Sequence, residues 1–240
     1  LELVAGYASG VVIYENYGTF PSFYDRWGVD LRGGNTIHSV ALGDADNDGD
    51  LDIAVGTASQ TLIYLTGAEG YPAAEGQVVG NADTRSVAWG DVDGDGDLDL
   101  AMGNVGAPSQ LYDNPLSPYT STYSGYPCFT DSDITSLALG DVDNDGDADL
   151  AVGIAFGDQP NVVYRSNDDG TYSGIAWTAY TNTETSSLAW GDVDNDGDLD
   201  LAVGNLGRPN LVYCNQGGTL QSTPCWTAPG TEFTYSVAWG

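Results

Sequence analysis

The 240-residue chain carries a net charge of −30, with five arginines, no lysine and one histidine. Such a negative chain excludes nucleic acid and anionic membrane surfaces as partners. No apolar run reaches 18 residues, which predicts that no segment inserts into a membrane. The 41% apolar content predicts a folded core rather than disorder, and the length suits one large all-β domain or two small ones.

The chain begins with LELVAG, a strand-like segment that aligns with LDIAVG at residues 51–56. No signal peptide is visible, so we expect that upstream sequence is missing. A strand motif, S-V/L-A-L/W-G, then recurs with spacings of 47, 50, 51 and 49 residues. Its five copies begin at Ser39, Ser86, Ser136, Ser187 and Ser236.

Each repeat continues in the same way after this first strand. An aspartate-rich loop leads to a second strand such as LDLAVG, and a third strand follows as TLIYL, SQLYD, NVVYR or NLVYC. A polar turn and a variable segment complete the unit. Four short strands in about 50 residues are typical of a propeller blade.

We therefore predict an all-β fold, a single five-bladed β-propeller over residues 1–240 with four-stranded antiparallel blades. The blades cover approximately residues 39–85, 86–135, 136–186 and 187–235, with a split blade from 236–240 and 1–38. N- and C-terminal strands would close this fifth blade. Within its first strand, Val237 and Trp239 should face one side and small residues the other, so that large side chains pack on small ones of the neighbouring blade.

Three cysteines are too few for a disulfide scaffold. Cys214 and Cys225 flank a segment that could form a hairpin, so they could pair across adjacent strands. Cys128 is predicted to be free.

The aspartate loops follow the pattern D-x-D-x-D-G-D-x-D, and the four loops hold 20 of the 35 acidic residues. Hard divalent cations such as Ca²⁺ take six to eight oxygen ligands. Carboxylates at positions 1, 3, 5 and 9 could converge on one ion, with a backbone carbonyl from position 7, whose side chain would face solvent. The glycine at position 6 would permit the turn. Four divalent ions would change the net charge from −30 to −22.

An EF-hand begins similarly but requires Glu at position 12 and flanking helices. Position 12 is Val55, Met102, Val152 or Val203, each in an apolar strand, so the EF-hand interpretation fails. A metal-free acidic turn is disfavoured because five adjacent carboxylates would repel one another. Oxygen-only ligands favour Ca²⁺ over zinc or copper.

The motif S-V-A-W-G-D-V-D-x-D-G-D-x-D-L-A-x-G resembles the FG-GAP and VCBS repeats of integrin-like β-propellers, and the resemblance covers the whole chain. It implies a Ca²⁺-binding hairpin between the first two strands of each of four blades. Glu2 alone remains of the loop in the split blade, so that site should be empty. The implied ligands are Asp44, Asp46, Asp48, Asp50 and Asp52; Asp91, Asp93, Asp95, Asp97 and Asp99; Asp141, Asp143, Asp145, Asp147 and Asp149; and Asp192, Asp194, Asp196, Asp198 and Asp200.

No catalytic constellation accompanies these loops, so we expect no enzymatic activity. His38, the only histidine, is expected to be a surface or interblade residue. The resemblance implies a calcium-stabilised extracellular or cell-surface scaffold, monomeric, that binds a protein or carbohydrate or acts in adhesion. Two alternatives are a lectin, in which Tyr119, Tyr123 and Tyr126 could stack on sugars, and an accessory domain of a polysaccharide-degrading enzyme.

Overall fold

The computed structural model describes residues 3–7, 10–16, 23–30, 35–67, 71–73, 76–113, 134–155, 159–167, 170–181 and 183–239. These residues form strands, loops and turns, and no helix among them could cross a membrane. The all-β prediction is confirmed. The predicted free Cys128 and the three candidate sugar-stacking tyrosines lie outside the described residues.

Twenty strands form five successive antiparallel sheets and one small hairpin within the described part. The first sheet contains β1 (Leu3–Tyr7), β2 (Gly10–Asn16) and β3 (Phe23–Asp30). The second contains β4 (Ile37–Gly43), β5 (Asp52–Thr57), β6 (Thr61–Tyr64) and β9 (Gln77–Gly80), with the hairpin β7 (Thr66–Gly67) and β8 (Tyr71–Pro72) inserted before β9. The third contains β10 (Asp83–Gly90), β11 (Asp99–Val105) and β12 (Gln110–Tyr112). The fourth contains β13 (Ile134–Gly140), β14 (Asp149–Ile154), β15 (Val162–Ser166) and β16 (Tyr172–Thr178), and the fifth contains β17 (Thr185–Gly191), β18 (Asp200–Asn205), β19 (Leu211–Tyr213) and β20 (Trp226–Thr227).

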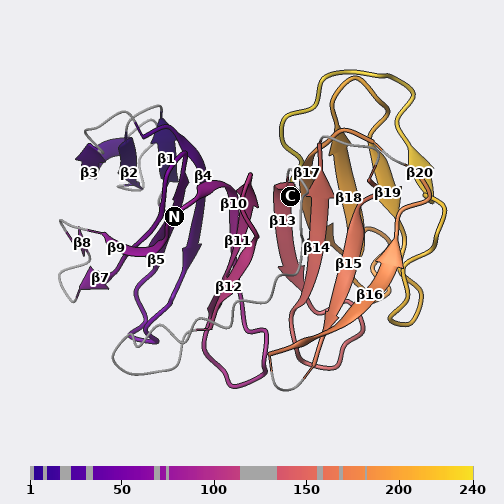
Figure 1. Ribbon diagram of the computed structural model, residues 1–240, viewed down its shortest axis with the longest axis horizontal. Coiled ribbons are helices and arrows are strands. Elements are labelled where there is room, and N and C mark those ends of the chain that lie inside the picture. Colours follow the sequence, from indigo (N-terminus) through magenta and orange to yellow (C-terminus); the bar gives the residue numbers. More distant parts are fainter. Residues whose placement is uncertain are drawn as a thin grey trace.

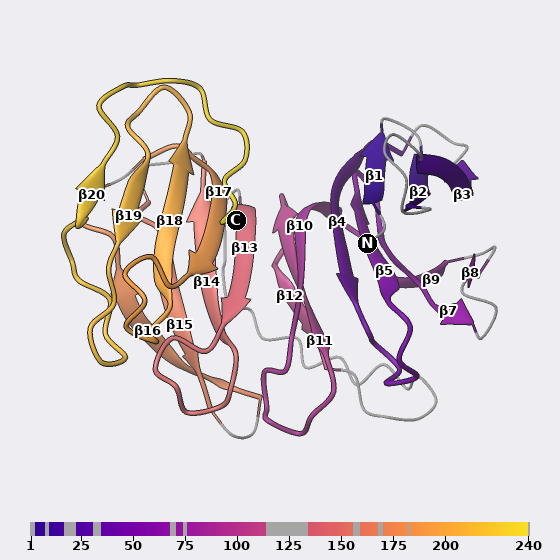
Figure 2. The same ribbon diagram turned by 180° about the vertical axis from the view of Figure 1, so that it is seen from behind.

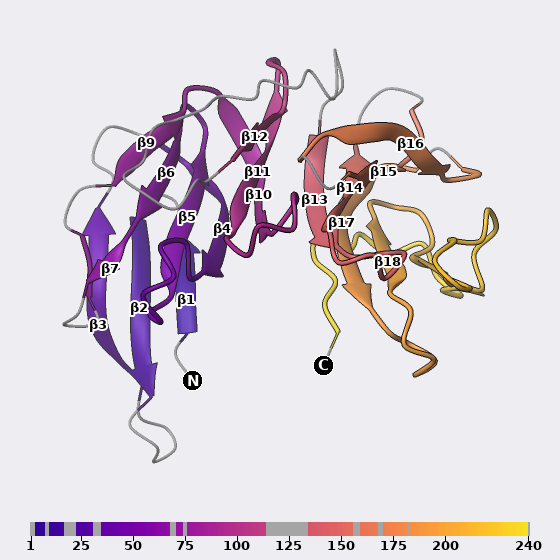
Figure 3. The same ribbon diagram turned by 90° about the horizontal axis from the view of Figure 1, so that it is seen from below.

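The sheets follow one another around an arc, with the first strands β4, β10, β13 and β17 toward its inner side (Figures 1 and 2). Seen from below, the two ends of the chain face the open side of this arc (Figure 3). The second strands β5, β14 and β18 are buried along their whole length. β5 and β14 lie between neighbouring sheets, whereas the far face of β18 is covered by the segment that contains Thr234 and Val237. The continuous apolar runs of the three strands follow from this burial.

A repeated hydrogen bond joins successive copies of the first-strand motif. In each case a backbone N–H of one copy donates to the serine Oγ that begins the preceding copy. The four bonds run from Val87 to Ser39 (3.1 Å), from Leu137 to Ser86 (2.9 Å), from Leu188 to Ser136 (3.0 Å) and from Val237 to Ser187 (3.1 Å).

The predicted packing of large on small residues is confirmed along this line of contact between successive copies of the first-strand motif, which we call the seam. The glycine that ends each first strand lies under a large side chain of the next sheet: Gly43 under Trp89, Gly90 under Leu139, Gly140 under Trp190 and Gly191 under Trp239. Added Cβ atoms at the first three glycines would come within 2.8–2.9 Å of these side chains. The serine bonds and the glycine contacts together set the spacing between sheets.

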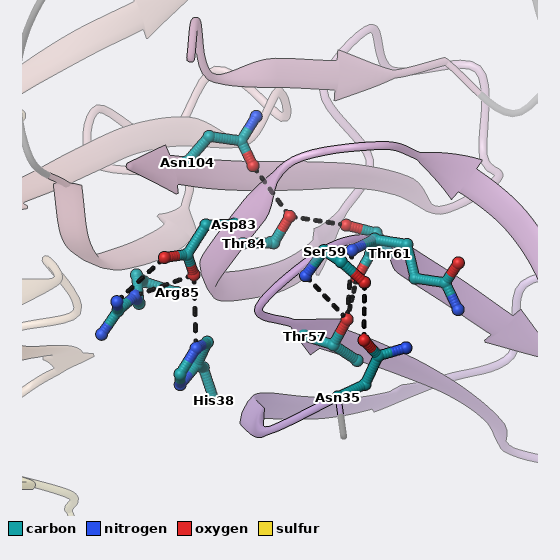
Figure 4. A network of polar contacts seen from close by, with 10 residues as sticks. Asn35, His38, Thr57, Ser59, Thr61, Asp83, Thr84, Arg85 and Asn104 are labelled. Atoms are coloured by element: carbon teal, nitrogen blue, oxygen red, sulfur yellow. Dashed lines mark hydrogen bonds and ion pairs between the residues drawn. The ribbon is translucent and has the colours of Figure 1, made fainter. Parts of the chain in front are cut away.

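A buried polar network links the second and third sheets (Figure 4). The hydroxyls of Thr61 and Thr84 lie 2.8 Å apart, and Thr84 donates to the side-chain oxygen of Asn104 at 2.8 Å. The same arrangement recurs between the fourth and fifth sheets, where the Asn161 amide donates to Thr185 at 2.8 Å and Thr185 donates to Asn205 at 3.2 Å. Each buried polar atom in these two series of hydrogen bonds thus has a hydrogen-bond partner, as burial requires.

The first strands begin two or three residues earlier than the motif predicts. The ladder shifts register just before the motif serine in all four complete first strands, for example between Ile37 and Ser39. This bulge is invisible in the apolar pattern because it adds one residue without altering the alternation that follows.

The fifth copy of the motif, Ser236–Trp239, is not a strand in the structure, which differs from the prediction. It nevertheless makes the seam contacts of a first strand, and the Trp239 indole donates to the Ala189 carbonyl at 3.2 Å, as the Trp190 indole does to Ala138 at 3.1 Å. Among the described residues, β1 pairs with β2 alone, so no ladder joins the two ends of the chain.

The possible disulfide is confirmed, because Cys214 and Cys225 are bonded with their Cα atoms 5.7 Å apart. The intervening segment turns back through a bridge between Asn215 and Leu220. The disulfide thus connects the end of β19 to the start of β20.

The seam predicts a position-specific cost for adding one methyl group. Gly140→Ala would place a Cβ 2.8 Å from Trp190 Cδ1 and 3.0 Å from Leu199 Cδ1. We expect a loss of about 1–3 kcal/mol in unfolding free energy, as for other overpacked interiors. Gly67→Ala is the matched control, since no atom lies within 4 Å of its added Cβ. Thermal unfolding followed by circular dichroism measures the stability of both variants. Equal midpoints for the two variants would contradict the close packing of Gly140 under Trp190.

Candidate metal centres

Each aspartate loop connects the first two strands of its sheet and contains two residues with left-handed backbone. The position-6 glycines Gly49, Gly96, Gly146 and Gly197 have φ between 92° and 106°, as the sequence predicted. Position 4 is also left-handed, at Asn47, Gly94, Asn144 and Asn195, with φ between 56° and 70°. Asparagine and glycine are the residues that tolerate this conformation, so the recurring N/G at position 4 was a readable signal that the motif analysis missed.

The position-1 carboxylate organises the turn by accepting backbone N–H bonds from within the loop. In the first loop Asp44 accepts from Asp48 and Gly49, each at 3.0 Å. The position-6 glycine makes the same 3.0 Å bond in the other loops, to Asp91, Asp141 and Asp192. The turn therefore holds the first acidic side chain in place without any ion.

The position-9 carboxylate is buried and ties the loop to the third strand. Asp200 accepts the N–H of Val193 in its loop and the N–H of Asn215 after β19, both at 2.8 Å. Asp52 and Asp149 make the equivalent pairs of bonds at 2.7–2.9 Å. All three side chains belong to fully buried residues. Position 9 is thus a structural clamp as well as a candidate ligand, a role the sequence did not reveal.

Four groups of three aspartates have carboxylate oxygens within 4.8 Å of one another, one group in each loop. Three of the five sequence-predicted ligands therefore converge in each loop. The predicted ligands Asp52, Asp95, Asp145 and Asp196 and the position-7 residues Asp50, Asp97, Asp147 and Asp198 are not members of these groups. The groups are Asp44, Asp46 and Asp48; Asp91, Asp93 and Asp99; Asp141, Asp143 and Asp149; and Asp192, Asp194 and Asp200.

The donor set fits a hard cation. One buried carboxylate oxygen in each of three loops, Oδ1 of Asp46, Asp91 and Asp143, has no hydrogen-bond partner. An unpaired buried polar atom is costly, and a Ca²⁺ ion coordinated by these oxygens would remove the cost. When bound, the ion would neutralise the clustered carboxylates and hold the two ends of each loop together. The loops contain no histidine or cysteine, so they offer neither imidazole nitrogen nor sulfur, which disfavours transition metals.

Burial and mutual repulsion raise the pKa of several of these carboxyls. Burial raises the pKa of Asp52 and of Asp149 to about 6, against the lowering effect of their backbone hydrogen bonds. At position 3, the pKa values of Asp46 and Asp93 are raised by burial and, more weakly, by the neighbouring loop carboxylates. In the absence of metal, these carboxyls therefore bind protons at a higher pH than an ordinary aspartate does.

The prediction that position-7 side chains face solvent is wrong for two loops. Asp97 and Asp147 are only 1% and 6% exposed. An added Cβ at Gly94 would lie 2.5 Å from Oδ1 of Asp147, so Asp147 packs on the preceding loop. Asp198 accepts from the Asn144 amide of its neighbour at 2.9 Å. The reason is tertiary: adjacent loops lie side by side, so an outward side chain meets the next loop instead of water.

A basic residue that the sequence analysis did not single out reaches the third loop. Nη1 of Arg165 lies 2.9 Å from Oδ2 of Asp143, and Nη2 of Arg165 donates to the Gly218 carbonyl at 3.1 Å. Its place directly after the third-strand tyrosine was visible in NVVYR, but only the register of β15 against β14 brings it to the loop.

His38 lies in β4 and contacts the next sheet, as predicted for an interblade residue. Its Nε2 is 3.2 Å from the Asp83 carboxylate, which Arg85 also binds (Figure 4). Burial, and then the charge of Arg85, lowers the pKa of His38. The position-12 residues Val55, Met102, Val152 and Val203 are buried in second strands, which agrees with the rejection of an EF-hand.

Two family models match the sequence. A model described as FG-GAP-like repeat matches residues 1–55, 46–102 and 141–203, which is more than half of the chain, and one described as FG-GAP repeat matches residues 84–125. No curated protein sequence matches the chain.

Solved structures share the propeller-like fold at low identity. A crystal structure of BBS1N in complex with ARL6DN, soaked with lead, is 15% identical with a TM-score of 0.59, covering 98% of this chain and 69% of that one. The mercury-soaked crystal is 14% identical with a TM-score of 0.56, covering 97% and 69%. A lectin from Agrocybe aegerita that recognises non-reducing terminal N-acetylglucosamine is 17% identical with a TM-score of 0.58, covering 94% and 65%.

The raised carboxyl pKa values predict how pH acts on the metal-free protein. Between the ordinary aspartate pKa of about 3.9 and the folded-state value of about 6, the folded chain binds more protons than the unfolded chain at Asp52 and Asp149. Stability from these groups therefore rises as pH falls from 7.5 to 5. We expect a higher midpoint of thermal unfolding at pH 5 than at pH 7.5 in excess chelator. With calcium added, protons compete with the ion, so the stabilisation by calcium should shrink at pH 5. A midpoint that falls with pH in chelator would contradict this assignment.

Proposed function

The chain belongs to the FG-GAP-like repeat family, and from this premise we propose that it is a calcium-stabilised, non-catalytic β-propeller module that binds a partner outside the cell. The observation that carries the proposal is the fourfold convergence of aspartate oxygens, with unpaired buried oxygens in three loops. Ca²⁺ prefers oxygen ligands of this kind. The Cys214–Cys225 disulfide supports an oxidising compartment.

The ion would act structurally rather than in catalysis. A catalytic ion needs an open coordination position beside an acid, base or nucleophile. The loop side chains already have structural tasks, since position 1 holds the turn and position 9 clamps the third strand, as at Asp192 and Asp200. His38 is engaged with Asp83 in a different part of the sheet. This arrangement supports a scaffold whose partner binds elsewhere on the surface.

We further propose that the ring closes with five blades. Val237 and Trp239 make the seam contacts of a first strand on the fifth sheet, and within the described ranges β1 forms the edge of a three-stranded sheet. Pairing Ser236–Trp239 with β1 would complete that blade. A crystal structure of the calcium-loaded protein in which these segments do not pair would refute closure.

Removal of calcium should lower the thermal stability substantially. An ion that binds only the folded state stabilises it by RT ln(1 + [L]/Kd), about 2.7 kcal/mol per site at a hundredfold excess over Kd. We expect a large drop in the unfolding midpoint when chelator replaces millimolar calcium, measured by calorimetric scanning. The same midpoint under both conditions would overturn the proposal.

A point variant tests whether the loops bind independently. Asp194→Asn removes one exposed ligand charge from the fourth loop, and titration calorimetry should show the number of calcium ions falling from four to three. Glu184→Gln, an exposed acid outside the loops, is the matched control and should keep four. Loss of all binding in Asp194→Asn would mean that the loops do not act separately.

Carbohydrate binding is the second candidate for the partner, favoured by the propeller-like fold shared with the Agrocybe aegerita lectin. We expect selective binding on a glycan array, with N-acetylglucosamine-terminated glycans as the first class to examine. Binding of no glycan in the presence of calcium would leave a protein partner, the role of a scaffold or adhesion module. Turnover of a plant or bacterial polysaccharide would contradict the non-catalytic assignment.

A further inference from the structure

One position beside each aspartate loop differs in charge among the repeats. It is the residue that directly follows the third-strand tyrosine, and the strand ladders make these positions equivalent. Tyr64, Tyr112, Tyr164 and Tyr213 pair with Ile53, Leu100, Leu150 and Leu201, each one residue after the position-9 aspartate. The residues that follow these tyrosines are Leu65, Asp113, Arg165 and Cys214.

In the third loop this position supplies a cation. Arg165 contacts Asp143, a position-3 carboxylate of the candidate ligand group, with Nη1 and Oδ2 2.9 Å apart. Its other terminal nitrogen donates to the Gly218 carbonyl of the next sheet, which holds the guanidinium over the loop. The Asp143 side chain is 15% exposed, so solvent screens this pair only partly.

The other three loops have no such cation at this position. Leu65 is uncharged, and Cys214 is committed to its disulfide with Cys225. Asp113 instead adds a carboxyl beside the second loop, because it directly follows Tyr112, which pairs with Leu100, the residue after the group member Asp99. The four loops thus share one backbone geometry but differ in local charge.

We propose that the residue after the third-strand tyrosine sets the calcium affinity of each loop, with Arg165 acting as a built-in counter-cation that makes the third loop the weakest site. This inference rests on the proposed function. Arg165 and the metal ion compete for Asp143, since both are positive and both bind its carboxylate. The additional acid Asp113 makes the second loop the strongest site. The expected filling order is the second loop, then the first and fourth, then the third.

The counter-cation also makes the third loop the least dependent on metal for its structure. Without calcium, Arg165 already neutralises one carboxylate of the third group, whereas the other loops keep their mutual repulsion. Removal of the arginine should therefore destabilise the calcium-free protein more than the calcium-loaded protein.

The position-6 glycines provide one reporter for each loop. The amides of Gly49, Gly96, Gly146 and Gly197 each donate to the position-1 carboxylate at 3.0 Å, so their chemical shifts should respond to an ion in their own loop. A calcium titration of the ¹⁵N-labelled full chain, followed by two-dimensional NMR, yields four separate midpoints. In the wild-type protein we expect the Gly146 midpoint at a calcium concentration about tenfold or more above the others.

Three variants separate charge from shape. Arg165→Gln removes the charge and keeps a donor for Gly218, so the Gly146 midpoint should fall about tenfold while the others stay unchanged. Arg165→Lys keeps the charge and should keep the midpoint high. Asp113→Asn should raise the Gly96 midpoint alone. The matched control is Arg85→Gln, because Arg85 pairs with Asp83 away from the loops and its loss should leave all four midpoints unchanged.

The outcomes distinguish this inference from the function on which it rests. If calcium shifts none of the four glycine amides, the proposed function itself fails. If all four respond with one shared midpoint, or if Arg165→Gln leaves the Gly146 midpoint unchanged, calcium binding stands and the role of Arg165 is overturned. Unfolding midpoints of Arg165→Gln in chelator and in calcium add a second readout, and an equal loss under both conditions would also contradict the counter-cation.

Discussion

The buried carboxylate at position 9 of each loop is the interaction on which fold and site both depend. Asp200 accepts one N–H from the hairpin loop and one from the residue after β19, so a single side chain fixes the loop against the third strand. A buried carboxylate needs such partners, because an unpaired one would be strongly destabilising. The same group then lies within reach of Asp192 and Asp194. The hydrogen bonds that fix the loop to the sheet therefore also position one carboxylate of the candidate metal group.

The seam between sheets extends this local unit into an arc. The second to fifth sheets each offer a serine hydroxyl and a glycine to the next copy of the motif, and receive an N–H and a large side chain in return, as between Ser136, Gly140 and Trp190. Because the loops end the same hairpins that form the seam, they line up as neighbours, and position 7 of one contacts position 4 of the previous one. Four acidic loops side by side concentrate the negative charge, and this charge is what the proposed divalent ions would neutralise.

Much of the fold and of the candidate site could be predicted from the sequence. The repeat of about 50 residues and the alternation in SVAWG predicted antiparallel units and the packing of large on small residues that Trp190 and Gly140 show. The spacing of acids predicted that carboxylates converge in each loop, but not that the third member is position 5 in the first loop and position 9 in the others. The bulge before each motif serine and the burial of Asp97 and Asp147 could not be predicted in this way. The contact of Arg165 with Asp143 could not be predicted either. These depend on which residues of different strands or sheets become neighbours, and a repeat pattern contains no such distances.

By itself, the sequence determined the local chemistry of this protein: the strand periodicity, the left-handed glycine at position 6 and the carboxylates that alternate along each loop. These depend on residues within a few positions of one another. Only the tertiary structure decided what makes the loops unequal. The register of β15 against β14 brings Arg165 to the third loop, and the disulfide engages Cys214 at the equivalent position in the next sheet. Charges act through space, so residues 22 positions apart, such as Asp143 and Arg165, interact only after the sheet has set their separation.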